Sequence, residues 1–192
     1  EELQVKGPTV MKGYWKRPDA TAEVFTEDGW FKTGDQADLS DAGRIRIKGR
    51  IKEIIVTSTG EKIPPTDMEL AIQTDPLFEQ VMVVGEARPF ITALAVVNEA
   101  EWEKFAKEFN VDPTDERMLM RRDIRMAALK RLKKAASRFP QYGIPRNIRL
   151  LKEHWTVDNG CLTVTMKLRR PIIREKLRAE IDELYTVPQN NV

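Results

Sequence analysis

Hydrophobic positions along the chain follow the two-residue period of strands in some stretches and the longer period of amphipathic helices in others. In the opening stretch, Leu3, Val5 and Val10 alternate with polar residues before Gly13 and Pro18 interrupt the pattern. We expect short strands and loops there, and no helix. Alternating or β-branched runs predict further strands at 30–35, 44–48, 52–57, 81–84, 91–97 and 148–151.

Two of the expected strands carry more detail. The strand at 30–35 should run out into a glycine and Asp35, which would leave the carboxylate exposed to a ligand. The next strand alternates strictly, so Ile45 and Ile47 should share one half-buried face. Gly49 should end that strand.

Helical periods or start signals occur in four later segments. The segments are a short helix at 68–72 that follows the start signal at 64–67, then 101–109, 115–139 and a last helix opened by Pro171, whose apolar side is Ile173, Leu177, Ile181 and Leu184. The order of these elements predicts an α+β protein in which helices flank a small mixed sheet.

The composition is that of a folded globular chain. Of 192 residues, 41% are hydrophobic and 32% are charged, and the net charge is +2, which excludes disordered and collagen-like classes. The length allows one domain or two small ones and is too short for a complete large synthetase. Because Cys161 is the only cysteine, no internal disulfide can form, which favours a reducing cytoplasm.

The longest nearly apolar stretch, 91–97, is far below the ~18 residues of a membrane span, and we expect no targeting signal. Residues 1–5 have the pattern of a strand already under way, so we expect a fragment of a longer protein. The sequence contains no Gly-x-Gly-x-x-Gly, phosphate loop or His-Glu-x-x-His. His154 and Cys161 could form a base and nucleophile pair, but coincidence is the favoured interpretation, and two such residues are too few for a zinc site.

Four short motifs follow one another along the chain. They are Phe-Lys-Thr-Gly-Asp at 31–35, Gly-Arg-Ile-Lys-Glu-Ile-Ile-Val at 49–56, Gly-Glu-Lys-Ile at 60–63 and Leu-Thr-Val-Thr-Met-Lys at 162–167. In this order they resemble the adenylate-forming superfamily of acyl-CoA synthetases, luciferases and peptide-synthetase adenylation domains, and most closely the long-chain fatty-acid CoA ligases. The opening segment is similar too, so the resemblance covers nearly the whole chain as the carboxyl-terminal third of such an enzyme.

The resemblance implies two domains and a nucleotide site. Residues 1–51 would be the β-rich tail of the large AMP-binding domain, and residues 52–192 would be the small mobile lid domain. Asp35 would accept hydrogen bonds from both ribose hydroxyls, and Arg50 would reach the same ribose with its planar donor fork. Lys52 would occupy the hinge about which the lid rotates. An ordinary turn or surface role is the alternative for each side chain.

The resemblance also assigns the two loops of the lid. Gly60 would line the tunnel for the pantetheine arm of CoA, where a missing side chain lets a thin ligand pass. Lys167 would enter the active site and bridge the fatty carboxylate and the α-phosphate during adenylation. Two positions depart from the family pattern. Thr59 stands where many relatives have a second glycine, and Val164 stands where long-chain ligases usually have proline.

By this resemblance, the parent enzyme would use ATP, CoA and Mg²⁺ to convert a fatty acid to an acyl-adenylate and then to acyl-CoA, releasing pyrophosphate and AMP. The helices between Trp102 and Phe139 favour the long-chain subgroup. The phosphate-gripping loop and the acyl tunnel would lie in a missing amino-terminal domain. That domain is the expected partner, and the chain alone should be inactive.

The basic run within the expected helix 115–139 has several explanations. A solvated charged face is the ordinary one, and nucleic acid is disfavoured because the net charge is small and no reader fold is recognised. The favoured functional hypothesis is attraction of CoA phosphates or of an anionic membrane, at the inner membrane face. A free-standing binding module that uses this basic helix is the alternative to the ligase. The sequence upstream of Glu1 would discriminate between them.

Overall fold

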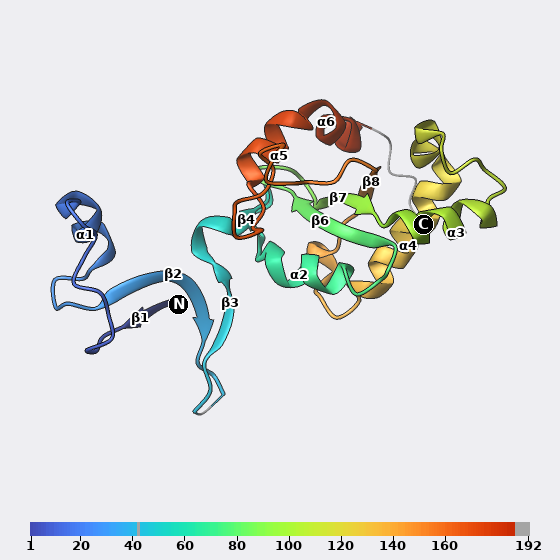
Figure 1. Ribbon diagram of the computed structural model, residues 1–192. Coiled ribbons are helices and arrows are strands. Elements are labelled where there is room, and N and C mark those ends of the chain that lie inside the picture. Colours follow the sequence, from blue (N-terminus) through green and yellow to red (C-terminus); the bar gives the residue numbers. More distant parts are fainter. Residues whose placement is uncertain (42, 187–192) are drawn as a thin grey trace. The chain divides into compact units, whose positions relative to one another are not determined.

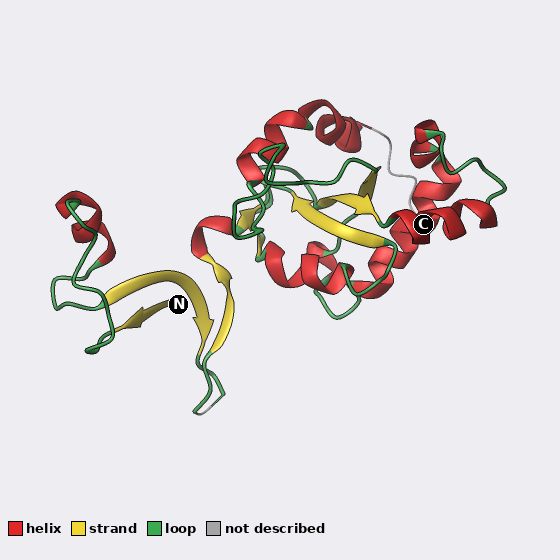
Figure 2. Cartoon of the chain, in the orientation of Figure 1, coloured by secondary structure: helices red, strands yellow, loops and turns green. Residues whose placement is uncertain are grey.

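The computed structural model describes residues 1–41 and 43–186 and divides the chain into two compact units, Glu1–Ile54 and the chain from Ile55 onward. Residues 187–192 of the expected second domain therefore lie outside the described part. Small sheets combine with helices, which confirms the α+β class (Figure 2).

The first unit is built on a three-stranded antiparallel sheet in the order β1-β2-β3. Its elements are β1 (Glu2–Val5), α1 (Pro18–Val24), β2 (Phe31–Asp38), β3 (Arg46–Arg50) and the 3₁₀ turn η1 (Ile51–Glu53). The expectation that no helix occurs in the opening stretch is wrong. Pro18 occupies the first turn of α1, where its missing N–H is not needed, and Asp19 adds a favourable negative charge there.

Both longer strands of this sheet differ from the sequence prediction. β2 does not run out at Asp35 but continues to Asp38, so the carboxylate lies within the strand. A register shift between Gln36 and Ala37 lets β3 pass through Gly49, so the predicted stop at that glycine is also wrong. The predicted burial fails as well, because Ile45 and Ile47 remain 61% and 48% exposed.

The second unit is built around a three-stranded mixed sheet in the order β6-β7-β8. β6 (Phe78–Val84) pairs antiparallel with β7 (Thr92–Val97), and β7 pairs parallel with β8 (Asn147–Leu151), as predicted for a mixed sheet. A separate hairpin joins β4 (Ile55–Val56) to β5 (Lys62–Ile63). The helices and 3₁₀ turns are α2 (Pro65–Ile72), α3 (Glu99–Glu108), η2 (Glu116–Met120), α4 (Arg122–Ala135), η3 (Gln141–Gly143), α5 (Arg170–Lys176) and α6 (Arg178–Thr186).

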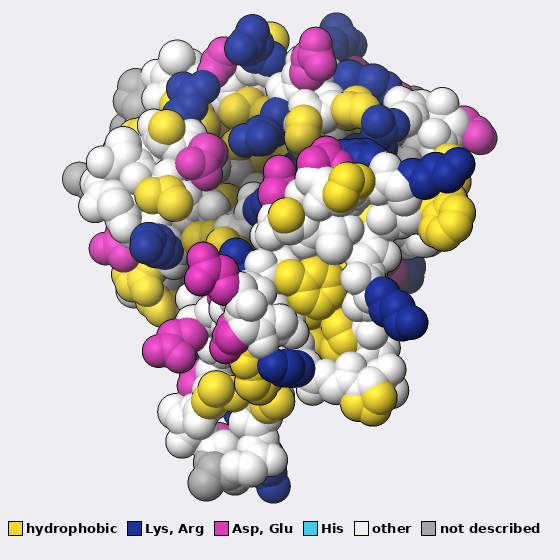
Figure 3. Space-filling view, turned by 90° about the vertical axis from the view of Figure 1, so that its left-hand side faces the viewer, with side chains coloured by type: hydrophobic (Ala, Val, Ile, Leu, Met, Phe, Trp, Pro, Cys, Tyr) yellow, Lys and Arg dark blue, Asp and Glu magenta, His cyan; other side chains and the backbone are white. Residues whose placement is uncertain are grey.

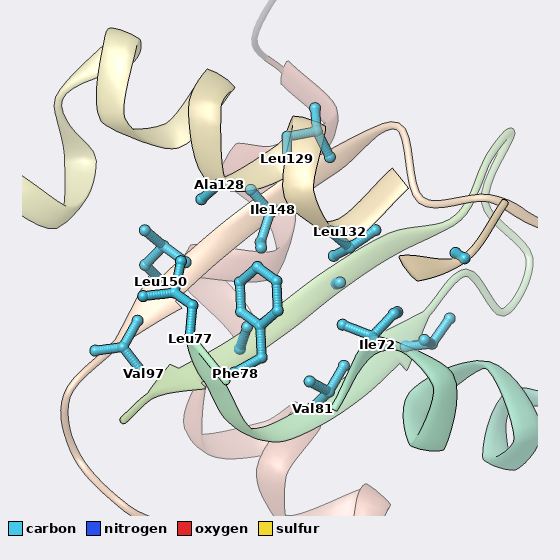
Figure 4. Close-up of a cluster of buried hydrophobic side chains, with 14 of the residues drawn as sticks. Ile72, Leu77, Phe78, Val81, Val97, Ala128, Leu129, Leu132, Ile148 and Leu150 are labelled. Carbon is cyan, nitrogen blue, oxygen red and sulfur yellow. The ribbon is translucent and has the colours of Figure 1, made fainter. Parts of the chain in front are cut away.

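Alternate residues of β6 and β7 point to opposite faces of this sheet, and each face has its own cover. One core cluster joins Phe78, Val81 and Ile148 to α2 and α4, with Leu132 of α4 among the labelled side chains (Figure 4). A second cluster joins Leu94 and its neighbours to Trp155, α5 and α6. The ribbon shows α5 and α6 on one face of the sheet and α2 and α4 on the other (Figure 1).

The single helix predicted over 115–139 is wrong. Its first part is the 3₁₀ turn η2, and α4 begins only at Arg122, because Arg121 adopts an extended backbone with ψ 131°. The Asp115 carboxylate accepts from the N–H of Arg117 and caps the first turn. The predicted apolar stripe is nevertheless buried, as at Ile124 and Leu132.

The last helix is also divided, into α5 and α6 at Leu177, although its apolar side is continuous. The N–H of Leu177 donates to Ile173 O at 3.0 Å, and the N–H of Ile181 donates to Leu177 O at 2.9 Å. Ile173, Ile181 and Leu184 are buried as predicted. None of the helices in the described residues is both long and apolar enough to cross a membrane.

Replacement of Leu94 by Ala should destabilise the second unit. The Leu94 side chain is 0% exposed between the strand neighbours and Trp155, so its loss removes buried contacts and leaves a cavity, at a cost of about 2–5 kcal/mol. Native-state hydrogen exchange of the β6–β8 amides measures the change. Leu70→Ala on α2 is the control, because that side chain is 59% exposed. Equal effects of the two substitutions would contradict the two-faced core.

Candidate functional site

The structure pairs the two residues predicted to bind the nucleotide with each other. Asp35 and Arg50 are register partners across β2 and β3, and Arg50 Nη1 donates to Asp35 Oδ1 at 3.0 Å and to Thr33 O at 3.1 Å. The Asp35 side chain is 27% exposed, and within the described residues its Oδ2 has no hydrogen-bond partner. The arrangement therefore presents one oriented carboxylate oxygen beside a guanidinium held in place.

The backbone of β2 around Asp35 is held in place by the first strand. The Thr33 hydroxyl donates to Leu3 O at 2.8 Å and accepts from the Asp35 N–H at 3.1 Å. The N–H of Gly34 donates to Glu2 Oε1 at 3.1 Å. The sequence motif thus needs β1 beside it to hold the carboxylate in one orientation, and the motif alone did not indicate the part played by Glu2.

Lys52 lies in the middle of η1, close to the division between the two units after Ile54. The turn is short, and the flanking residues Arg50 and Ile54 are extended, with ψ 132° and 121°. The Lys52 side chain is exposed and forms no ion pair or hydrogen bond with the described part of the chain. Its backbone position, more than its charge, therefore distinguishes Lys52, and its role as a hinge stays a prediction.

Gly60 lies in a tight turn between β4 and β5. Its φ is +84°, and a Cβ atom there would meet nothing within 4 Å. The Gly60 N–H donates to Thr57 O at 3.0 Å, and the Thr57 hydroxyl accepts from the Glu61 N–H at 3.1 Å. A bond of 3.0 Å from the Ser58 N–H to Arg88 O ties the turn to the loop after β6. The result is a braced turn with open backbone at the glycine.

Lys167 lies at the base of an exposed five-residue loop closed by the bridge between Leu162 and Leu168. The Thr163 N–H donates to Lys167 O at 2.9 Å, and the Lys167 N–H donates to the Thr163 hydroxyl at 3.1 Å. Met166 reaches a φ of +61°, which makes the turn tight. Among the described residues, the Lys167 ammonium has no acidic partner, so it is available to an anion.

Sequence reasoning missed a buried ion pair behind this loop. Arg170 Nη1 and Nη2 donate to Glu69 Oε1 and Oε2, each at 2.6 Å, and the Val83 N–H donates to Glu69 Oε1 at 2.8 Å. Only 17% of the arginine side chain and 7% of the glutamate side chain are exposed. A signal existed, because Glu69 shares the buried stripe of α2 with Met68 and Ile72, where a carboxylate needs a partner.

The basic surface of α4 is smaller than the sequence suggests. Arg121 Nη2 lies 2.7 Å from Asp123 Oδ2, and Arg131 Nη2 lies 2.5 Å from Asp75 Oδ1. Burial raises the pKa of Asp75, but hydrogen bonds from Arg131 and a backbone N–H lower it more. The pKa of this carboxyl therefore lies below its usual value. Exposed cations without an acidic partner in the described residues include Arg122, Lys130 and Lys133.

The remaining candidate pair, His154 and Cys161, is not brought together, because each side chain contacts another group. His154 Nε2 lies 3.2 Å from Glu79 Oε1, while the buried Cys161 thiol faces Asn159 O at 3.9 Å. In residues 1–41 and 43–186, no group of three or more His, Cys, Asp or Glu side chains could hold a metal ion. These residues therefore do not fit a Mg²⁺ site of their own.

The second unit combines a small mixed sheet, a separate β4–β5 hairpin with a braced glycine turn, and a loop whose lysine has no acidic partner in the described residues. The family model described as AMP-binding enzyme C-terminal domain matches residues 52–188. The chain belongs to this family of AMP-binding, adenylate-forming enzymes, which confirms the resemblance inferred from its four motifs.

Relatives of the chain are long-chain acyl-activating enzymes. It is 37% identical over 192 residues to the long-chain-fatty-acid–CoA ligase FadD15 of Mycobacterium tuberculosis, covering 96% of this chain and 31% of the relative. It is 33% identical to the long-chain-fatty-acid–[acyl-carrier-protein] ligase AEE15 of Arabidopsis thaliana, covering 96% of this chain and 25% of that protein. The chain thus spans less than a third of the length of these relatives.

Solved structures of adenylation domains share the fold. The adenylation domain of a carboxylate reductase from Mycobacterium chelonae matches with a TM-score of 0.82 and 28% identity, covering 97% of this chain and 28% of that one. The corresponding domain from Segniliparus rugosus, in complex with AMP and a co-purified carboxylic acid, matches with a TM-score of 0.80 and 28% identity, covering 96% and 28%.

Gly60→Ala should destabilise the β4–β5 turn without any steric clash. The positive φ costs an alanine about 1–2 kcal/mol, while the space around the Cβ position is empty. Hydrogen exchange of the Lys62 and Ile63 amides measures the change. Gly60→Asn is the matched control and should cost less, because asparagine tolerates this backbone region better. A larger loss for the asparagine variant would contradict the backbone explanation.

Proposed function

We propose that this chain is the carboxyl-terminal part of a longer fatty-acid CoA ligase. The enzyme joins a fatty acid to ATP, giving acyl-adenylate and pyrophosphate, and then transfers the acyl group to the CoA thiol, releasing AMP. The observation that carries this proposal is the unpaired Lys167 ammonium on an exposed loop of an AMP-binding C-terminal domain. Its relatives include ligases with long-chain fatty acids in their names.

The first unit supports the proposal that a larger domain belongs beside it. Ala37 is the only buried residue in its described part, and Trp15 is 86% exposed. Hydrophobic side chains are visible among the charged ones on the surface (Figure 3). A sheet with so little buried area cannot offset its conformational entropy alone. We propose that residues 1–51 complete the nucleotide domain of the same enzyme and that residues 52–192 form its lid.

In the first half-reaction, Lys167 contributes a mobile positive charge. Its ammonium binds the fatty carboxylate and an α-phosphate oxygen together, which brings the two anions into contact and offsets the charge that grows as the carboxylate attacks phosphorus. The exposed, short loop suits this task, because the ammonium is not already neutralised within the chain. Asp35 accepts hydrogen bonds from both ribose hydroxyls, and Arg50, which donates to Asp35 Oδ1, reaches the same ribose.

In the second half-reaction, the Gly60 turn replaces the lysine at the reacting centre. Open backbone at Gly60 allows a narrow pantetheine arm to pass, and the hydrogen bonds of Thr57 keep the turn in shape. Rotation about the Lys52 position exchanges the two loops. CoA is the thiol proposed here, with acyl carrier protein as the alternative suggested by the name of the Arabidopsis relative. We place the enzyme in the cytoplasm, with Mg²⁺ held by residues outside this chain.

Lys167→Ala in the complete enzyme should lower fatty-acid-dependent exchange of pyrophosphate into ATP by about 10²–10³-fold, because one electrostatic contact to the transition state is lost. Lys107→Ala, an exposed lysine on α3, is the matched control and should leave exchange unchanged. The 192-residue chain alone should show no exchange. Normal exchange by the Lys167 variant, or turnover by the chain alone, would contradict the proposal.

We further propose that the exposed cations of α4 attract phosphate groups, either those of CoA or those of anionic phospholipids. Arg122, Lys130 and Lys133 have no acidic partner in the described residues, whereas Arg121 and Arg131 are already paired. Unneutralised charges on one helix raise the local concentration of anions, and salt weakens this effect.

Reversal of these three charges to Glu in the complete enzyme should weaken sedimentation with vesicles of anionic phospholipid several-fold, or raise the KM for CoA by a similar factor, most strongly at low salt. The first result identifies a membrane surface and the second identifies CoA as the source of the phosphate. Reversal of the exposed Lys107, Arg174 and Arg178 controls for net charge. If both measurements stay at the control level, the cations of α4 are only solvated.

A further inference from the structure

The buried pair of Glu69 and Arg170 joins parts of the chain that are 101 residues apart. Glu69 belongs to α2, and Arg170 opens α5 three residues after Lys167. Because Glu69 Oε1 also accepts from the Val83 N–H, the carboxylate that Arg170 contacts is itself hydrogen-bonded to the central sheet. The pair therefore ties the segment behind the lysine loop to α2 and to the buried central sheet.

The other contacts of this segment are a backbone hydrogen bond and apolar packing. The Arg169 N–H donates to Cys161 O at 2.8 Å, and Leu168 packs against the second core cluster. Beyond them the loop is held by bonds among its own residues, from Thr163 to Lys167, and Val164 at its tip is 86% exposed. In this part of the chain, Arg170 supplies the two-point ionic contact that reaches another element of the fold.

The pair is a poor candidate for stability alone. Removal of two charges from water costs about as much as their attraction returns, so buried ion pairs are often no better than apolar side chains of the same size. What a two-point contact between guanidinium and carboxylate does supply is direction, because both groups are planar and both oxygens are engaged. Direction matters where a side chain must reach a reacting centre, since misplacement by about 1 Å can cost on the order of 10²-fold in rate.

We propose that Glu69 and Arg170 are positioning residues for adenylation. They hold the start of α5 against the sheet so that Lys167, at the base of the adjoining loop, leaves the domain surface at a fixed place and in a fixed direction. This inference rests on the proposed role of Lys167. It adds residues that touch no substrate and that act only through the lysine loop.

The test compares the two half-reactions in the complete enzyme. Arg170→Met should lower the kcat of adenylation by about 10–100-fold and leave the KM for ATP and fatty acid within about twofold, because the lysine is displaced while the substrates still bind. Acyl transfer to CoA from preformed acyl-adenylate should change by less than about threefold, since Lys167 takes no part in it. Arg174→Met, an exposed arginine on the same helix, is the matched control and should match the parent in both half-reactions.

Each result distinguishes the positioning role from an alternative explanation. A parallel fall of both half-reactions together with the folded fraction would mean that the pair only stabilises the fold. Normal adenylation by Arg170→Met beside a defective Lys167→Ala would overturn the inference and leave the proposed function intact. Normal adenylation by Lys167→Ala would instead remove the proposed function and, with it, this inference.

A second variant covers the case in which Arg170→Met does not fold. Glu69→Gln keeps an oxygen for the Val83 N–H but removes the negative charge that holds the guanidinium. Adenylation should fall by about 3–10-fold, with acyl transfer unchanged. In the 192-residue chain, the same variant should speed hydrogen exchange at the amides of Thr163 and Lys167, with β7 unaffected. Unchanged adenylation and unchanged exchange in Glu69→Gln would overturn the inference.

Discussion

The central strand β7 sets the constraint on which the second unit depends, because all six of its residues are buried. A strand that is apolar on both sides must be covered on both sides, or its side chains stay in water. Helices α2 and α4 supply one cover, and Trp155 with α5 and α6 supplies the other. The β4–β5 hairpin, which carries the glycine turn, precedes α2, and the lysine loop precedes α5.

That arrangement explains why the two proposed half-reactions belong to different loops of one compact unit. Each loop precedes a covering helix, so each is braced where it meets the core and exposed where it could meet a substrate. Val83 and Glu69 link the sheet to α2, and Arg170 extends the link to α5. Rigid elements with exposed ends suit a lid that presents one loop and then the other, because rotation preserves the geometry of each loop.

The two units differ in how their charges are paired and in how much apolar surface they bury. In the second unit, the deepest charges are matched at two points, and the acidic side chains of Asp75 and Asp123 neutralise part of the basic helix. The first unit has a single buried residue in its described part and leaves Ile45 and Ile47 in water. Such a surface is expected for a piece of a larger sheet domain and not for a domain that is stable by itself.

The sequence by itself determined the features that depend on neighbours within a few residues. Its pattern predicted the strand at 91–97 and the buried stripe of α4, and its four motifs identified the family, because periodicity and short motifs are local. Only the tertiary structure decided which distant groups meet. It placed Arg50 on Asp35, broke the basic helix at Arg121, and brought Arg170 to Glu69 across 101 residues. Such contacts depend on the whole path of the chain, and no local pattern encodes that path.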